Sequence, residues 1–180
     1  RSALERAKAS IAVPTQGSSG LAPVLDDPVS RAIRLVQQEQ WEAGEAAIRA
    51  ELARQPQDAR LLYILGELRL KRDGPSAAKD PIEKVLALQP SHGPALNMWA
   101  WIHAEQGIEL ESAEQRVIEA LHSHPRIGSY WDTLGWVLHL RGRTTEACLA
   151  LARAVRLSPG DETARIHLDV CQGDEVKSLP

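Results

Sequence analysis

Two histidines, His122 and His124, are the residues of this chain whose type and spacing first suggest chemistry. Imidazole is a common zinc ligand, but residues two apart on a helix point to different faces, and no cysteine or carboxylate cluster joins this pair. They are better interpreted as solvated side chains near the negative end of a helix dipole. The sequence also has no Gly-rich phosphate loop and no G-x-S-x-G motif. We therefore predict that the protein is not an enzyme and uses no cofactor and no metal.

The charge balance and the hydropathy limit the class of partner. The 180 residues carry 21 basic and 24 acidic side chains, a formal net charge of -3, so nothing favours a phosphate backbone or an anionic membrane. No apolar run approaches the ~20 residues that cross a bilayer, and no charged-then-apolar leader follows Arg1. We expect no nucleic-acid partner, no membrane insertion, and a soluble chain cut from something longer. The compartment stays open, with the cytoplasm favoured over an exported location.

Four prolines form the strongest pattern in the sequence. Pro56, Pro90, Pro125 and Pro159 stand 34, 35 and 34 residues apart, and each closes a stretch that contains two short amphipathic helical patterns. A fixed period of about 20 to 50 residues indicates one supersecondary unit used several times. All the expected elements are helices. The sequence therefore predicts an all-α stacked array.

The pattern inside one period is clearest from residue 128 to residue 159. Large apolar residues and small residues stand there at fixed places before the closing proline: Trp131, Leu134, Gly135, Leu138, Ala147, Leu151, Ala154 and Pro159. The segments 59–90 and 93–125 repeat this order of residue types, which resembles the tetratricopeptide repeat. The resemblance implies a right-handed superhelical array of antiparallel helix pairs, in which small residues let the two helices of a pair approach closely.

This register divides the chain into segments. We expect a short helix or peptide-like segment at 1–13, a flexible linker at 14–24, the repeat array at 25–172 and a tail at 173–180. Within the array we expect a degenerate repeat at 25–56, repeats at 59–90, 93–125 and 128–159, and a capping helix at 161–172. In that last helix, Ile166, Leu168 and Val170 are expected to pack against the preceding helix pair.

In arrays of this family the first helices of successive repeats line a concave groove. The resemblance places these residues in a peptide-binding groove: Tyr63, Glu67, Leu70, Asn97, Met98, Trp101, Asp132, Thr133, Trp136 and His139. Trp101 and Trp136 hold the same place in adjacent repeats, so we expect them side by side. Partly exposed Trp favours an apolar or amphipathic peptide as ligand, although both indoles would instead be core if they pack against neighbouring helices. Only Asn97 resembles the clamp with which some members hold a carboxylate tail, so a chaperone tail is not expected.

The two cysteines lack Cys-x-x-Cys spacing and are too few for a disulfide scaffold. In the repeat register Cys148 follows Ala147, and Cys171 lies in the capping helix that should run beside it. The two residues are therefore expected to be neighbours. We favour two buried thiols, the more frequent arrangement, over a disulfide that would imply an oxidising compartment.

These features predict a protein–protein interaction module, an adaptor or assembly factor that binds an apolar or amphipathic peptide segment in its groove. Its own residues 1–13 are a possible ligand in cis, because a linker of about ten residues can span ~30 Å. The alternative is a structural spacer or self-association element of a larger protein.

Overall fold

The structure is a computed structural model that describes residues 28–178. These residues form α2 (Pro28–Gln37), α3 (Trp41–Arg54), α4 (Ala59–Asp73), α5 (Pro75–Leu88), α6 (Gly93–Gln106), α7 (Leu110–Ser123), α8 (Gly128–Leu140), α9 (Thr144–Leu157) and α10 (Glu162–Ser178). The predicted all-α fold class is confirmed. The expected segments 1–13 and 14–24, and the first residues of the degenerate repeat, lie outside the described residues.

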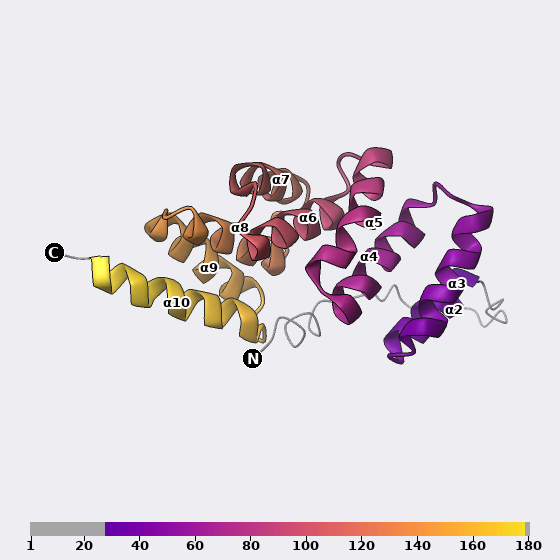
Figure 1. The fold of residues 1–180 in the computed structure, drawn as a ribbon. Coiled ribbons are helices and arrows are strands. Elements are labelled where there is room, and N and C mark those ends of the chain that lie inside the picture. Colours follow the sequence, from indigo (N-terminus) through magenta and orange to yellow (C-terminus); the bar gives the residue numbers. More distant parts are fainter. Residues whose placement is uncertain (1–27, 179–180) are drawn as a thin grey trace, which may run out of the picture. The chain divides into compact units, whose positions relative to one another are not determined.

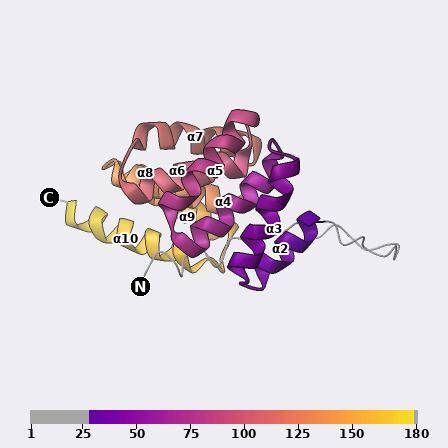
Figure 2. The ribbon, with the colours of Figure 1, turned by 45° about the vertical axis from the view of Figure 1, so that its right-hand side comes forward.

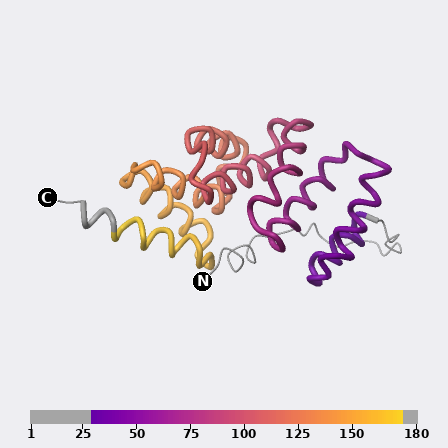
Figure 3. Tube along the Cα trace, viewed as in Figure 1, coloured from indigo at the N-terminus to yellow at the C-terminus, as the bar shows by residue number. Residues whose placement is uncertain are grey.

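The helices belong to two compact units, residues 1–88 and residues 89–180. The described part of unit 1 holds α2 to α5, and that of unit 2 holds α6 to α10 (Figure 1). Helices pair in chain order: α2 with α3, α4 with α5, α6 with α7 and α8 with α9. The short turn inside each pair can be followed in Figure 3. These pairs fall within the segments 25–56, 59–90, 93–125 and 128–159, and α10 follows them alone.

The core of unit 1 explains how a weak first repeat still packs. One buried apolar cluster of this unit comes from α2, α3 and α4: Val29, Ala32, Val36, Ile48, Leu61, Leu65 and Leu68. The α4 helix begins where the Asp58 carboxylate accepts hydrogen bonds from the backbone N–H groups of Arg60 and Leu61, at 2.9 and 3.3 Å. Unit 1 is therefore held by an apolar layer and a capped helix start.

A buried glutamate, Glu45, joins α3 to α4 in the same unit. It is 6% exposed, and its carboxylate pairs with Arg69 at 3.0 Å and with Arg72 at 2.7 Å. Burial alone would raise the pKa of Glu45, but the hydrogen bonds from Arg69 and Arg72, together with the charges of Arg72 and Arg49, outweigh it and lower that pKa. The pairing compensates a charge that would otherwise be costly to bury.

Gly135 shows why unit 2 needs small residues at fixed places. A Cβ atom added at this glycine of α8 would lie 2.5 Å from the Leu151 Cγ of α9 and 3.1 Å from the Ala147 carbonyl oxygen. These distances are too short for any side chain, so the glycine is what lets α9 approach α8. In Figures 1 and 2, α10 lies on the far side of α8 and α9 from α7.

The α10 helix differs from the expected capping helix in length. It continues to Ser178 instead of ending at Gln172, because the sequence has no proline there and a single Gly173 costs a helix only about 1 kcal/mol.

The packing of α10 also differs from the expectation. Ile166 and Val170 are 52% and 42% exposed, so the prediction that they pack against the last helix pair is wrong for both. Leu168 is half-buried. The buried positions are instead the small or polar residues Ala164, His167 and Cys171, which lie three or four residues apart on one helix face.

Cys148 of α9 and Cys171 of α10 form a disulfide, with Cα atoms 5.6 Å apart. The preference for two free thiols is therefore wrong, whereas the expectation that the two residues are neighbours is right. The reason is the rotation of α10: the face that packs on α9 ends in Cys171, which is fully buried, and Cys148 is 8% exposed. The bond fixes α10 to the last helix pair.

Candidate binding surface

The predicted groove residues lie on the first helices of the pairs, and they divide between the two units. Tyr63, Glu67 and Leu70 are on α4 of unit 1. The remaining ones are on α6 and α8 of unit 2: Asn97, Met98, Trp101, Asp132, Thr133, Trp136 and His139. Each unit therefore presents its own set of candidate binding residues.

The set in unit 2 continues onto α10. Asn97 and Trp101 stand one turn apart on α6, and the repeat register places Asp132 and Trp136 at the same positions of α8. Adding 34 to the α8 positions gives Ile166 and Val170 on α10, which contacts α8 as α8 contacts α6. We call these residues the first-helix stripe: Asn97, Trp101, Asp132, Trp136, Ile166 and Val170.

Sequence reasoning missed Ile166 and Val170 as candidate ligand-binding residues. The signal was available, because the same 34-residue step that relates the closing prolines also leads from Asp132 to Ile166 and from Trp136 to Val170. Their large exposed fractions agree with a position on an open surface and not in the core.

Asp132 and Trp136 are engaged by α10. The Nδ1–H group of His167 donates a hydrogen bond to Asp132 Oδ1 at 2.9 Å, and both residues are buried, at 3% and 7% exposure. The Trp136 indole stacks on the imidazole of His167 with ring centroids 4.4 Å apart and on that of His139 at 5.2 Å. Asp132 is thus a helix-packing residue, and part of the Trp136 ring is covered by α10.

Two other predicted groove residues are buried in unit 2. Met98 is 8% exposed and Thr133 is 3% exposed, and the Thr133 hydroxyl donates to the backbone carbonyl of Ser129 at 3.0 Å. This bond within α8 satisfies the Thr133 hydroxyl. Because both side chains are buried, neither is available to a ligand at the surface. The partly exposed members are Asn97, Trp101, Trp136 and His139.

The expected contact between Trp101 and Trp136 stays a prediction. Both are partly exposed and occupy the same register position of α6 and α8. Among the ring contacts of the described residues, those of Trp136 are with His139 and His167. A surface with Trp101 at one end and Ile166 with Val170 at the other is nevertheless apolar along three successive first helices.

The candidate surface of unit 1 has a different chemistry. Tyr63, Glu67 and Lys71 stand four residues apart along α4, and the Tyr63 hydroxyl hydrogen bonds to the Glu67 carboxylate. Burial raises the pKa of Glu67 even though the Lys71 charge and the Tyr63 hydrogen bond oppose the shift. Burial likewise lowers the pKa of Lys71. This row is polar, and it holds one acidic and one basic side chain that are both half-buried.

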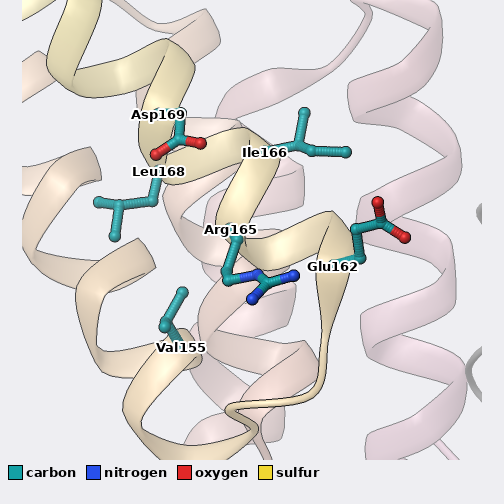
Figure 4. Close-up of a pocket in the computed structure, with 6 residues that line it drawn as sticks. All are labelled: Val155, Glu162, Arg165, Ile166, Leu168 and Asp169. Atoms are coloured by element: carbon teal, nitrogen blue, oxygen red, sulfur yellow. The ribbon is translucent and has the colours of Figure 1, made fainter.

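A hollow lies beside α10 and is lined by residues of α9 and α10. Figure 4 shows Val155 of α9 and five residues of α10 around it: Glu162, Arg165, Ile166, Leu168 and Asp169. Arg165 and Asp169 stand 34 residues after Trp131 and Gly135, the positions that let α8 pack against α9. Because charged residues replace the aromatic and the glycine, this face of α10 is better suited to contact with solvent than to close packing against another helix.

The family follows from a comparison of the whole chain with known protein families. A family model described as a tetratricopeptide repeat matches residues 29–93 and 97–162. The chain belongs to the tetratricopeptide repeat family. The resemblance read from the proline spacing is therefore confirmed.

Relatives of known sequence or structure agree with this assignment. A TPR repeat-containing protein of Pseudomonas aeruginosa is 26% identical over 126 residues, which cover 70% of this chain and 21% of that protein. The structure of Pseudomonas aeruginosa PilF matches with a TM-score of 0.70 at 20% identity, covering 84% of this chain and 69% of that one. An O-GlcNAc transferase mutant of Thermobaculum terrenum matches at 0.59 and 24% identity, over 63% of this chain and 22% of the transferase.

The family sets the general class of function. Tetratricopeptide repeat proteins are generally interaction scaffolds without catalytic activity of their own, so the fold supports a protein–protein interaction module. The chain spans about a fifth of the length of the relative from Pseudomonas aeruginosa that it matches. Among the described residues, no helix has the length and apolar character needed to span a membrane.

Proposed function

We propose that unit 2 binds an apolar or amphipathic peptide segment of a partner protein along the first-helix stripe, as an adaptor or assembly factor would. The observation that supports this most is the exposure of Ile166 and Val170, at 52% and 42%, because Val170 is in register with Trp136 and Trp101 and Ile166 lies one turn before it. Large apolar side chains at an open surface are costly to leave in water, and Trp is enriched among the residues that dominate binding.

The shape of the stripe favours a peptide over a small molecule. Three successive helices at about 8–10 Å spacing make a row about 20 Å long. Of two hollows among the described residues, one lies at the turn of Gln55 to Asp58, away from the stripe, and the other is lined by residues of α9 and α10 and shares only Ile166 with the stripe. A small ligand would need an enclosed pocket, whereas an extended or helical segment can place several apolar side chains along such a row.

The experiment begins with a peptide selected from a displayed random library on the oxidised full chain. Its dissociation constant is then measured by fluorescence anisotropy for the wild type, Trp101→Ala and Ile166→Ala/Val170→Ala. We expect each variant to weaken binding at least ~10-fold, because each removes apolar contact area from the stripe. Circular dichroism of each variant checks that it is folded.

Leu149→Ala is the matched control, because Leu149 is a 68% exposed leucine on α9, outside the stripe. Affinity should be unchanged in this variant. Equal affinity of the stripe variants and the wild type, or an equal loss in Leu149→Ala, would rule out the stripe as the binding surface. A concentration-dependent oligomer that survives the stripe variants, seen by sedimentation, would favour the spacer alternative.

The chain itself carries one segment with the proposed chemistry, and we extend the proposal to it as a ligand in cis. Residues 1–13, RSALERAKASIAV, contain Leu4, Ala7 and Ile11 at helical spacing among charged residues. A chain that lacks residues 1–13 should bind the synthetic 1–13 peptide, and the full chain should bind it more weakly because the tethered copy competes. No binding of this peptide to the shortened chain would exclude the contact in cis.

A further inference from the structure

We propose that the α10 part of the first-helix stripe is present only while Cys148 and Cys171 are joined, so that peptide binding by unit 2 depends on the redox state of this pair. This inference rests on the proposed function and specifies how the same surface is regulated. The cysteines are the only two in the chain, so within one chain the pair is either joined as a disulfide or reduced to two thiols.

Apart from the disulfide, few apolar contacts hold α10 in place. Among the described helices, α10 packs against α8 and α9. Its fully buried side chains, Ala164, His167 and Cys171, are small or polar, while Ile166 and Val170 are exposed. Hydrophobic burial, the main force that docks the other helices, is therefore weak for this one.

The position of the disulfide in the two helices determines how it favours docking of α10. Cys148 is near the start of α9 and Cys171 is in the second half of α10, so the bond lies far from the turn that joins the two helices. Its two cysteines are 23 residues apart in sequence. Closing a loop of this length restricts the undocked state and so favours docking; a fully flexible chain of this length would give a factor on the order of 10² as an upper bound.

His167 connects the disulfide with the first-helix stripe. His167 lies four residues before Cys171 on the same face of α10, and it bonds Asp132 at 2.9 Å and stacks on Trp136 at 4.4 Å. When Cys171 is released from Cys148 of α9, the contacts of His167 with α8 are left without this covalent support. Undocking would remove Ile166 and Val170 from the stripe and leave the buried Asp132 without its partner. The stripe would then lose its α10 residues and the hydrogen bond that packs α10 on α8.

The chemistry is ordinary thiol–disulfide exchange with a dithiol reductant. A thiolate of the dithiol attacks one sulfur of the bond and forms a mixed disulfide, and its second thiolate then releases that sulfur. The protein gains two electrons and two protons as two thiols, and the dithiol becomes a cyclic disulfide. Because Cys148 and Cys171 are only 8% and 0% exposed, attack requires a local opening of α10, and we expect the less buried sulfur of Cys148 to be attacked first.

The test compares the full chain oxidised with glutathione disulfide and the same chain reduced with dithiothreitol. Hydrogen exchange followed by mass spectrometry reports the docking of α10, and anisotropy of the library-selected peptide reports the stripe. On reduction we expect exchange in α10 to accelerate at least ~10-fold, with α6 and α7 unchanged, and affinity for the peptide to fall by about the same factor. The Cys148→Ser/Cys171→Ser variant should match the reduced protein with or without dithiothreitol.

Equal protection of α10 and equal affinity in the two redox states would overturn the inference. It would also be overturned if the serine variant still responded to dithiothreitol, because the reductant would then act at another site. Failure of the proposed function looks different: peptide affinity would be insensitive to Trp101→Ala and to Ile166→Ala/Val170→Ala in both redox states. The exchange of α10 is measured without peptide, so its result decides the docking step on its own.

Discussion

The imidazole of His167 on α10 donates a hydrogen bond from Nδ1 to Oδ1 of Asp132 on α8, across 2.9 Å, and both side chains are buried. The bond gives a polar residue of the final helix a partner in the preceding helix pair. It also removes Asp132 from the residues that can contact a ligand directly. The row of first-helix positions thus contains a helix-packing residue beside the residues proposed to bind a peptide.

Asp132→Ala tests the contribution of this bond to stability. The substitution leaves the His167 Nδ1–H group buried without its partner, which should lower the free energy of unfolding by about 1.5–3 kcal/mol. Asp132→Asn keeps an acceptor oxygen and should lose less. Urea denaturation followed by circular dichroism measures both variants, and a wild-type midpoint for Asp132→Ala would show that the bond contributes nothing.

Gly135→Ala tests the close approach of α8 and α9. The added Cβ atom would meet Leu151 Cγ at 2.5 Å, so the pair must separate or rearrange, at a cost of about 1–3 kcal/mol in unfolding free energy. Gly160→Ala is the matched control, because a Cβ atom there has no neighbour within 4 Å. Thermal unfolding of the two variants should differ clearly, and equal destabilisation would contradict the packing explanation.

Glu45 should make the stability of unit 1 fall in acid. Its pKa is lowered in the folded protein because the pairing with Arg69 and Arg72 outweighs the effect of burial. Its stabilisation is therefore complete above the unfolded-state pKa of about 4.3 and is lost as the pH falls through the lower folded-state value. In Glu45→Gln the slope of unfolding free energy against pH should be shallower in this acidic window. An unchanged slope would show that the ion pairs do not persist in solution.

Glu67 should change the unfolding free energy with pH in the opposite direction to Glu45. Burial raises its pKa, so the folded protein holds this proton more tightly than the unfolded chain does. The contribution of Glu67 to unfolding free energy then decreases as the pH rises from the unfolded-state pKa of about 4.3 through the folded-state value. Glu67→Gln should remove this decrease, and NMR titration of the Glu67 side chain gives the pKa directly. A pKa at or below the ordinary value would refute the prediction.

The register of the repeats could be predicted from sequence because it depends on local residue types. Gly135 and Ala147 must be small and Leu151 large for α8 and α9 to pack, and these requirements recur every 34 or 35 residues. The family and the all-α fold follow from that recurrence.

The details of α10 could not be predicted in the same way. Its apolar residues suggested that Ile166 and Val170 were buried, whereas the buried polar residue is His167, whose partner Asp132 lies 35 residues earlier. Such a pair carries no local signal. The disulfide was equally hidden, because neighbouring cysteines have the same sequence pattern whether their sulfurs are bonded or not.

The indole N–H signals of the tryptophans give the most direct test of the binding surface, because the chain has five and they are spread over both units. NMR spectra are recorded while the library-selected peptide is added to the oxidised full chain. We predict that the signals of Trp101 and Trp136 shift, whereas those of Trp41, Trp99 and Trp131 stay in place. Shifts at Trp41 or Trp131 with Trp101 and Trp136 unaffected would contradict the account.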